Sequence, residues 1–312
     1  MNHTQGPDCR SAQRLCSAVI GLLFCFGAAA PALGAGTLDK VRDSSKLILG
    51  YRADTPPFSY TDAAGKAAGY SVALCEKIAD ATKAELKLPS LAVEYVPVTA
   101  ANRFDALQQS QIDLLCGTTT PTLERRTTID FSIPIFFAGV GAIVRIDADT
   151  RLRDVLAGRT EPTRPIWRAA PGEFTEKVVF AVVGGSTIER SLIDRLKARR
   201  IEVTVSPVAD YAMGVQMVLD RRAAALFGDR PVLLDAAKRS PAAGQLLVIE
   251  RNFTQEPLAL AMRRGDDQFR LVVDRTLSHL FRSKDMGPLY ATYFGAPGEG
   301  TLEFFQAVAL PD

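Results

Sequence analysis

The sequence predicts an α/β protein with two lobes, and two observations lead to this fold class. Apolar runs of strand length alternate with segments whose apolar residues recur at helical spacing, a pattern typical of βαβ units and a parallel sheet. The alternation restarts once and is followed by a third α/β segment. A chain that returns in this way indicates two lobes joined by more than one crossing, with a ligand cleft between them.

The first series of elements occupies the part of the chain before residue 120. KLILGYR is an apolar run of strand length, and Leu74 and Ile78 lie four apart, as one face of a helix requires. Expected strands are 46–52, 91–98 and 112–117, and expected helices are 71–82 and 102–109.

The second series begins near residue 141 and ends with the returning segment. Ser186 and Glu189 have the spacing of a capping box at the start of a helix. A polar stretch rich in proline and arginine, 147–176, contains Trp167 and is expected to form a long exposed excursion. Expected strands are 141–145, 178–186, 202–208, 223–229 and 258–264, and expected helices are 186–200, 211–220, 269–281 and 286–295.

Residues 1–35 have the order of a secretory signal peptide. Arg10 and Arg14 precede the apolar run 19–30, and the small residues of PALGAG follow it. We therefore expect an exported, soluble mature protein, located in the periplasm if the organism has an outer membrane.

The charge of the mature chain argues against a nucleic-acid partner. Removing Asp8, Arg10 and Arg14 from 37 basic and 35 acidic side chains leaves 35 basic and 34 acidic ones. A balance this even provides no general positive field, so any anion must be bound by individually placed arginines.

Few cysteines and histidines remain after residue 35. Cys75 and Cys116 are able to pair in an oxidising compartment, but we favour two separate buried thiols because the sequence does not give their separation. His279 is the one mature histidine, and its apolar helical surroundings favour a structural role. We therefore expect no metal site.

The stretch CGTTTPTLER places threonine hydroxyls and Arg125 directly after a predicted strand. Ligands of parallel α/β sheets bind outside the carboxyl ends of strands. Thr120 is able to cap a helix that begins at Pro121, and an arginine fork binds a carboxylate through two parallel hydrogen bonds. The pattern indicates a carboxylate site, although an ion pair between Arg125 and a surface acid fits the same residues.

Four segments together carry a family resemblance. They are GYRADTPPFSYTDAAGKAAGYSVALCEKIA, VPVTAANRFDALQQSQIDLLCGTTTPTLERRTTIDFS, VVGGSTIERSL and ALFGD, and they follow one another in the family's order. The chain resembles the periplasmic amino-acid-binding proteins of ABC importers (solute-binding protein family 3), and within them the glutamate/aspartate-binding branch, over nearly all of 38–295. The resemblance implies the type II periplasmic-binding-protein fold and a monomer that delivers an amino acid to a membrane permease. It also implies that the protein is not an enzyme, with no catalytic residue and no cofactor.

The resemblance also implies roles for individual residues. Arg125 matches the arginine that clamps the ligand α-carboxylate, with Thr118 and Thr120 as its partners. Thr187 matches a contact from the second lobe to the same carboxylate, and Asp229 matches the acceptor for the α-ammonium.

Arg52 and Arg103 match two positions that face the side-chain carboxylate in the acidic branch. An unpaired buried charge costs several kcal/mol, so these arginines would favour glutamate or aspartate over neutral amino acids. Ala100 and Tyr211 depart from the branch, which leaves a dicarboxylate or a modified acidic amino acid open.

Two aromatic residues are further possible ligand contacts. Phe58 follows two prolines, and Tyr211 stands where the acidic branch often has histidine. Phe58 would stack on the aliphatic part of a ligand or pack at the rim of the cleft.

The expected domain division follows from the resemblance. The first lobe would comprise 36–136 and 255–312, and the second lobe 137–254 with its insertion at 147–176. The hinge strands would lie near 135–139 and 252–256.

Two other functions stay open. A few proteins of this architecture are exported dehydratases of cyclic carboxylic acids, but such an enzyme needs an acid or base at the leaving group, and carboxylates are few here. A soluble ligand sensor for a membrane receptor is the second alternative.

Overall fold

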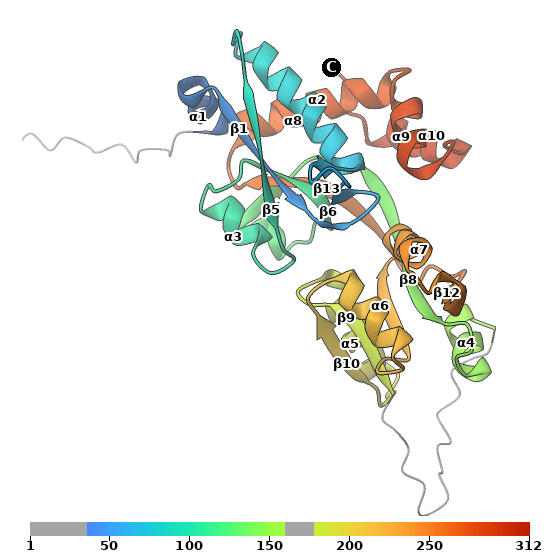
Figure 1. The fold of residues 1–312 in the computed structure, drawn as a ribbon. Helices are drawn as coiled ribbons and strands as arrows, with labels where there is room; N and C mark the ends of the chain where they lie inside the picture. The colour runs from blue at the N-terminus through green and yellow to red at the C-terminus, as the bar shows by residue number, and fades with distance from the viewer. Residues whose placement is uncertain (1–35, 160–177) are drawn as a thin grey trace, which may run out of the picture. The chain divides into compact units, whose positions relative to one another are not determined.

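The computed structural model describes residues 36–159 and 178–312, and Figure 1 shows their arrangement. The predicted signal peptide and most of the predicted excursion lie outside these residues. None of the described helices is long and apolar enough to cross a membrane.

The first sheet is built around β1, with β5 and β6 parallel to it on either side. Strand β13 pairs antiparallel with β6 and with β7. The bounds are β1 Lys46–Arg52, β5 Ala92–Val98, β6 Leu114–Thr119, β7 Ile129–Phe131 and β13 Gln255–Arg263.

Helices cover both faces of this sheet, as the alternation of strand residues requires. Leu47 and Leu49 pack in one buried cluster with Leu74 and Ile78 of α2, whereas Ile48 between them packs on the opposite cluster. Figure 1 shows α2 and α8 on one side of the sheet and α3 on the other. The bounds are α1 Thr37–Ser44, α2 Tyr70–Glu85, α3 Arg103–Gln108, α8 Asp267–Arg282, α9 Met286–Phe294 and α10 Glu299–Val308.

The second group of strands has the order β10-β9-β11-β8, with β12 also paired to β8. Residues Phe180 and Val182 of β9 pack with Ile188 of α5, while Ala181 and Val183 pack in the cluster that contains residues of α6 and α7. The bounds are β8 Phe136–Arg145, α4 Thr150–Ala157, β9 Val179–Val183, α5 Thr187–Ala198, β10 Thr204–Val208, α6 Tyr211–Leu219, β11 Ala225–Asp229, α7 Arg230–Arg239 and β12 Leu246–Val248.

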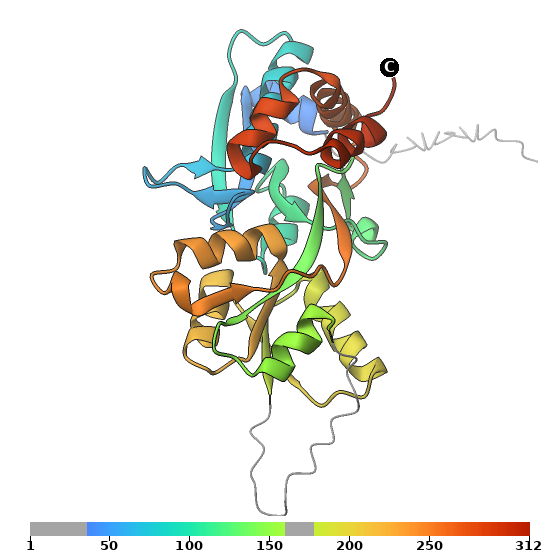
Figure 2. The ribbon, with the colours of Figure 1, turned by 90° about the vertical axis from the view of Figure 1, so that its right-hand side faces the viewer.

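The two groups are joined by one antiparallel pairing between β8 and β13. Gln255 lies opposite Gly139, and Glu256 lies opposite Ala138. Figure 2 shows these two strands running side by side. The two segments predicted as hinge strands therefore pair with each other, and the two-lobed α/β fold is confirmed.

Three sequence expectations were wrong or incomplete. No α-helix begins at Pro121; a single 3-10 turn, η1 Arg125–Thr127, follows instead. The excursion is not wholly irregular, because α4 forms within it and Asp149 caps that helix by accepting from the Leu152 N–H. Helices α1, α7 and α10, a second 3-10 turn (η2 Ala243–Gln245) and a small sheet were not predicted; the sheet's strands are β2 Asp54–Thr55, β3 Ser59–Thr61 and β4 Ala67–Ala68.

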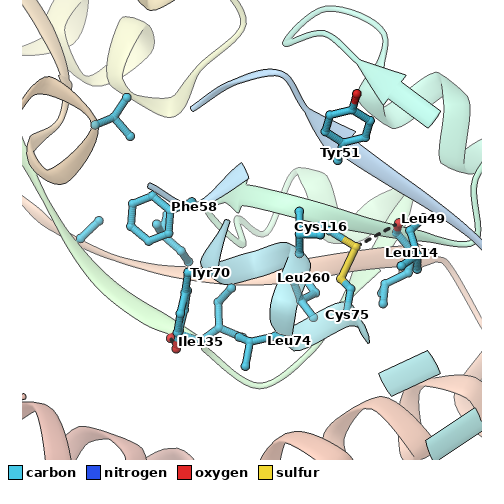
Figure 3. Packing of buried hydrophobic residues seen from close by; sticks show 14 of the residues in the cluster. Leu49, Tyr51, Phe58, Tyr70, Leu74, Cys75, Leu114, Cys116, Ile135 and Leu260 are labelled. Carbon is cyan, nitrogen blue, oxygen red and sulfur yellow. Dashed lines mark hydrogen bonds between the residues drawn. A yellow bond between two sulfur atoms is a disulfide. The ribbon is translucent and has the colours of Figure 1, made fainter. Parts of the chain in front are cut away.

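Cys75 and Cys116 form a disulfide between α2 and β6, which corrects our preference for two separate thiols. Figure 3 shows the bond inside the cluster of buried residues that includes Leu74 and Leu114. Both cysteines are fully buried, as expected. The pairing depends on α2 packing against β6, a tertiary contact that the sequence pattern does not specify.

We expect the double variant Cys75→Ala/Cys116→Ala to lose about 4 kcal/mol of unfolding free energy, because the disulfide closes a 41-residue loop in the unfolded chain. Urea unfolding of the variant and of the wild type measures this difference. Wild-type protein unfolded in the presence of a reductant should match the variant. Equal midpoints with and without reductant would contradict the expectation.

Candidate ligand-binding site

Arg125 lies at the start of η1, shortly after the end of β6. Its Nη1 donates to the Thr120 carbonyl oxygen at 2.9 Å, and its Nη2 donates to the Gly185 carbonyl oxygen at 3.2 Å. The guanidinium carbon lies 5.1 Å from the centre of the Phe104 ring. Burial lowers the pKa of Arg125, and Glu256 and Glu124 oppose this by attracting its charge. Arg125 is thus half-buried and held by carbonyl groups rather than paired with a surface acid.

The carbonyl oxygen of Gly185 also accepts a hydrogen bond from a second arginine, Arg103. The Gly185 φ of 69° lies in the left-handed region that glycine adopts without strain. Arg103, the first residue of α3, donates from Nη2 to the Gly185 carbonyl oxygen at 3.3 Å. The Gly-Gly turn of the second lobe therefore contacts two arginines of the first lobe.

Arg103 is the more deeply buried of the two, with 5% of its surface exposed. Its Nε and Nη1 atoms are buried and have no hydrogen-bond partner among the described residues. Burial, and after it repulsion from Arg125 and Arg52, lower its pKa to about 9. A buried cation with two unpartnered donor nitrogens calls for an anion.

Arg52 has an internal partner that the sequence analysis missed. Its Nε and Nη2 donate to the two carboxylate oxygens of Asp54 at 2.7 and 2.6 Å. Such a bidentate pair neutralises the guanidinium. Asp54 stands two residues after Arg52 in the sequence, and that spacing was an available signal. The geometry therefore does not favour the predicted contact between Arg52 and a ligand carboxylate, because the carboxylate of Asp54 already occupies the guanidinium fork.

Glu256 is the second residue that the sequence analysis missed. Its Oε2 accepts hydrogen bonds from the hydroxyl of Thr120 at 3.0 Å and from that of Thr187 at 2.8 Å. The Thr120 hydroxyl therefore donates to a residue 136 positions away instead of capping a helix at Pro121. Thr187 opens α5, and the predicted capping box holds there, since Ser186 Oγ accepts from the Glu189 N–H.

Asp229 ends β11 and is 8% exposed. Burial, and after it repulsion from Glu256, raise its pKa to about 7, against the opposing effects of Arg52 and Tyr211. The Asp229 N–H donates to the Tyr211 hydroxyl oxygen at 3.4 Å. Burial also raises the pKa of Tyr211. Asp229, Tyr211 and Glu256 thus belong to the same electrostatic neighbourhood as the arginines.

Two further predicted site residues, Phe58 and Thr118, are not part of the hydrogen-bonded group described above. Phe58 has no exposed surface and packs against Tyr70, Phe136 and Phe294, with ring centres 6.3, 4.9 and 5.1 Å away. Figure 3 shows Phe58 beside Tyr70 in the core, which favours packing over ligand contact. Thr118 is half-buried in β6, two residues before Thr120.

The described residues provide no metal site, and their large cavity lies away from the predicted ligand position. Among the described residues, no group of three or more His, Cys, Asp or Glu side chains is placed to hold a metal ion. A cavity of about 700 Å³ beside Val179, Leu192 and Phe227 contains none of the predicted site residues. Its lining includes Gly158 and Val178, which adjoin residues outside the described part, so we assign it no ligand.

Residues 47–296 match the sequence profile of the bacterial extracellular solute-binding proteins, family 3. The chain belongs to this family. This family 3 protein is 28% identical over 263 residues to the L-glutamate/L-aspartate-binding protein of Pseudomonas aeruginosa, covering 84% of this chain and 81% of the relative. It is 26% identical over 269 residues to the glutamate/aspartate import solute-binding protein of Escherichia coli, covering 86% and 82%.

Solved structures agree with the fold of this family 3 protein. An ancestral amino-acid-binding protein, described as a precursor of cyclohexadienyl dehydratase, superimposes with a TM-score of 0.67 at 27% identity, covering 83% of this chain and 100% of that one. An ancestral arginine-binding protein bound to arginine gives 0.65 at 25% identity, covering 80% and 99%. The expected type II fold is confirmed.

Proposed function

We propose that this family 3 protein captures L-glutamate or L-aspartate outside the cytoplasm and delivers it unchanged to the permease of an ABC importer. The observation that carries the proposal is Arg103, a buried guanidinium with two unpartnered donor nitrogens beside a second arginine, Arg125. A ligand with two carboxylates supplies anions to both. A neutral amino acid leaves one cation buried without an anion, which costs several kcal/mol.

The ligand's ammonium is expected at Asp229. That carboxylate is buried, repelled by Glu256, and has no ion pair with a lysine or arginine among those of the described residues. The names of the glutamate/aspartate-binding relatives support the same ligand class.

Closure of the two lobes over the ligand is the proposed mechanism. Contacts between the lobes gather around the site: Gly185 accepts from both arginines, and Glu124 pairs with Arg190 of α5. The paired segments of β8 and β13 would act as the hinge. A permease would then distinguish the closed, liganded form from the open one.

Isothermal titration tests the proposal, using protein that has been unfolded and refolded to remove carried-over ligand. L-Glutamate or L-aspartate should bind more tightly than L-glutamine and succinate. Chromatography of the ligand after incubation should recover it unchanged, because the proposal includes no chemistry. Conversion of the ligand would contradict a purely binding role, and absence of binding by every amino acid would overturn the proposed ligand class.

The affinity for L-glutamate should fall about tenfold when the pH drops from 8 to 6. In the ligand-free protein the pKa of Asp229 is about 7, so the carboxyl is mostly neutral at pH 6 and attracts an ammonium weakly. The ligand itself does not titrate in this interval. Titrations at pH 6, 7 and 8 measure the effect, and the variant Asp229→Asn should bind weakly at each pH without this dependence.

The same raised pKa predicts the opposite trend for stability. Between about pH 4 and about pH 7, the folded, ligand-free protein keeps a proton on Asp229, whereas the unfolded chain has released it. Its contribution to the free energy of unfolding is therefore present below about pH 4 and is lost as the pH rises through about 7. The stability effect is measured by urea unfolding at pH 4 to 8 without ligand. For the affinity prediction of the preceding paragraph, a pH dependence that persists in Asp229→Asn would contradict the role of Asp229 as the acceptor of the ammonium.

A further inference from the structure

Glu256 stands at the junction of three segments that are distant in the sequence. It lies on β13, in the part of the strand that pairs with β8. Its Oε2 accepts from Thr120, which follows β6, and from Thr187, which opens α5. Its Oε1 accepts from the Thr254 hydroxyl at 3.3 Å. These bonds place a protein carboxylate where the family resemblance predicts the ligand α-carboxylate.

The direction of these hydrogen bonds limits what else the hydroxyls bind. A threonine hydroxyl has a single proton, and a carboxylate only accepts. While Thr120 and Thr187 donate to Glu256, each has only oxygen lone pairs left for a ligand. A ligand carboxylate at those oxygens would be repelled, whereas an ammonium would donate to them.

The charges around the two threonine hydroxyls also favour an ammonium group. Repulsion from Glu256 contributes to the raised pKa of Asp229, and among the ion pairs of the described residues none involves either carboxylate. Arg125 attracts Glu256 without a direct ion pair. Arg52 attracts Asp229, but its fork is already bonded to Asp54. A cation between the two carboxylates would relieve their repulsion.

A separate observation shows where the anionic part of such a ligand would go. The Nε and Nη1 atoms of Arg103 are buried and unpartnered, on a side chain that is 5% exposed. Arg103 and Arg125 both reach the Gly185 carbonyl, so their guanidinium groups lie together. The site therefore has hydrogen-bond donors at the two arginines and acceptors around Glu256 and Asp229.

We propose that Glu256 makes the site selective for carboxylates that carry a protonated amine, by turning the Thr120 and Thr187 hydroxyls into acceptors for that amine beside Asp229. The carboxylates of the ligand are then left to Arg125 and Arg103. This inference rests on the proposed function and narrows it, because it excludes dicarboxylates without an amine. It also reassigns the two threonine hydroxyls, which the family resemblance had placed on the ligand carboxylate.

The test compares L-glutamate with glutarate, which has the same two carboxylates and the same chain length but no amine. Wild-type protein should bind glutarate at least about 100-fold more weakly than L-glutamate, by isothermal titration. Glu256→Gln keeps the shape but removes the charge. It should lower the affinity for L-glutamate by about 30-fold or more and change the affinity for glutarate little. The ratio of the two affinities should therefore fall at least about tenfold.

Glu250→Gln is the matched control, since Glu250 is an exposed glutamate six residues earlier, and it should leave both affinities unchanged. Thermal unfolding checks that each variant folds. If Glu256→Gln does not fold, Thr187→Val provides the second reading. It removes a hydroxyl acceptor and should weaken L-glutamate more than glutarate.

Equal loss of both ligands in Glu256→Gln, or in Thr187→Val, would overturn the inference and leave the proposed function standing. A wild-type preference for glutarate would also overturn it, while a solute-binding role remained. Failure of the wild type to bind any amino acid would overturn the proposed function itself, and the assignment of Glu256 with it.

Discussion

Arg125→Ala is expected to weaken L-glutamate binding by at least about 100-fold. The guanidinium is half-buried, bonded to the Thr120 carbonyl and close to the Phe104 ring, both in the first lobe, so these contacts orient it without the second lobe. Truncating one partner of a buried, hydrogen-bonded charge pair costs about 2–5 kcal/mol, and about 2.8 kcal/mol corresponds to 100-fold. Isothermal titration of the refolded variant measures the loss.

Arg126 provides the control for this prediction. It is the adjacent residue, it is exposed, and its guanidinium lies over the Phe131 ring, 5.7 Å from the ring centre. Arg126→Ala should therefore bind L-glutamate within about threefold of the wild type. Arg125→Lys should recover little of the affinity, because an ammonium lacks the planar fork that reaches two acceptors. Near-normal binding by Arg125→Ala would show that the carboxylate is held elsewhere.

Arg103→Met is expected to change both specificity and stability. Without the buried cation, L-glutamate should bind at least about 100-fold more weakly, while L-glutamine should change by less than about tenfold. The ligand-free variant should also be more stable than the wild type by about 1–3 kcal/mol, because methionine fills similar space without an unpaired buried charge. Titration with both amino acids and urea unfolding without ligand measure the two effects.

Arg52→Met is the matched comparison, because it removes a buried arginine that already has a partner. Its loss leaves the Asp54 carboxylate without the bidentate bonds of 2.7 and 2.6 Å, so this variant should be less stable than the wild type. The two arginine variants should thus shift the unfolding midpoint in opposite directions. Destabilisation by Arg103→Met, with equal loss of glutamate and glutamine, would remove Arg103 from the ligand's side-chain end.

Most of the secondary structure followed from residue periodicity. Strand β1 and helix α2 were predicted to within a few residues, because each has one continuous pattern of buried positions. Helix α10 was missed although Phe305 is 1% exposed. The burial of Phe305 depends on Phe281 and Tyr290, whose ring centres lie 5.0 and 5.8 Å away, so it belongs to the packing rather than to the local pattern.

Some residues of the candidate site were likewise predictable from the local sequence, whereas the contacts of others depend on the tertiary structure. Arg125 was found because a threonine-rich strand end followed by an arginine is a local signal with a known position on an α/β sheet. Arg103 was chosen through the family resemblance, and its burial and unused donors give that choice a physical reason. The partner of Arg52 was adjacent in the sequence, but its geometry was not readable there.

The sequence by itself determined the α/β class, the order of strands and helices, and the position of Arg125 shortly after a strand, because each is visible in local patterns of residues. Only the tertiary structure decided that Cys75 bonds to Cys116, that Gly185 contacts two arginines, and that Glu256 accepts hydrogen bonds from the Thr120 and Thr187 hydroxyls. The physical reason is that these contacts join residues 41 to 136 positions apart. Hydrogen bonds and charges act across space, so the tertiary packing of α2, α3, α5, β6 and β13 sets which groups meet.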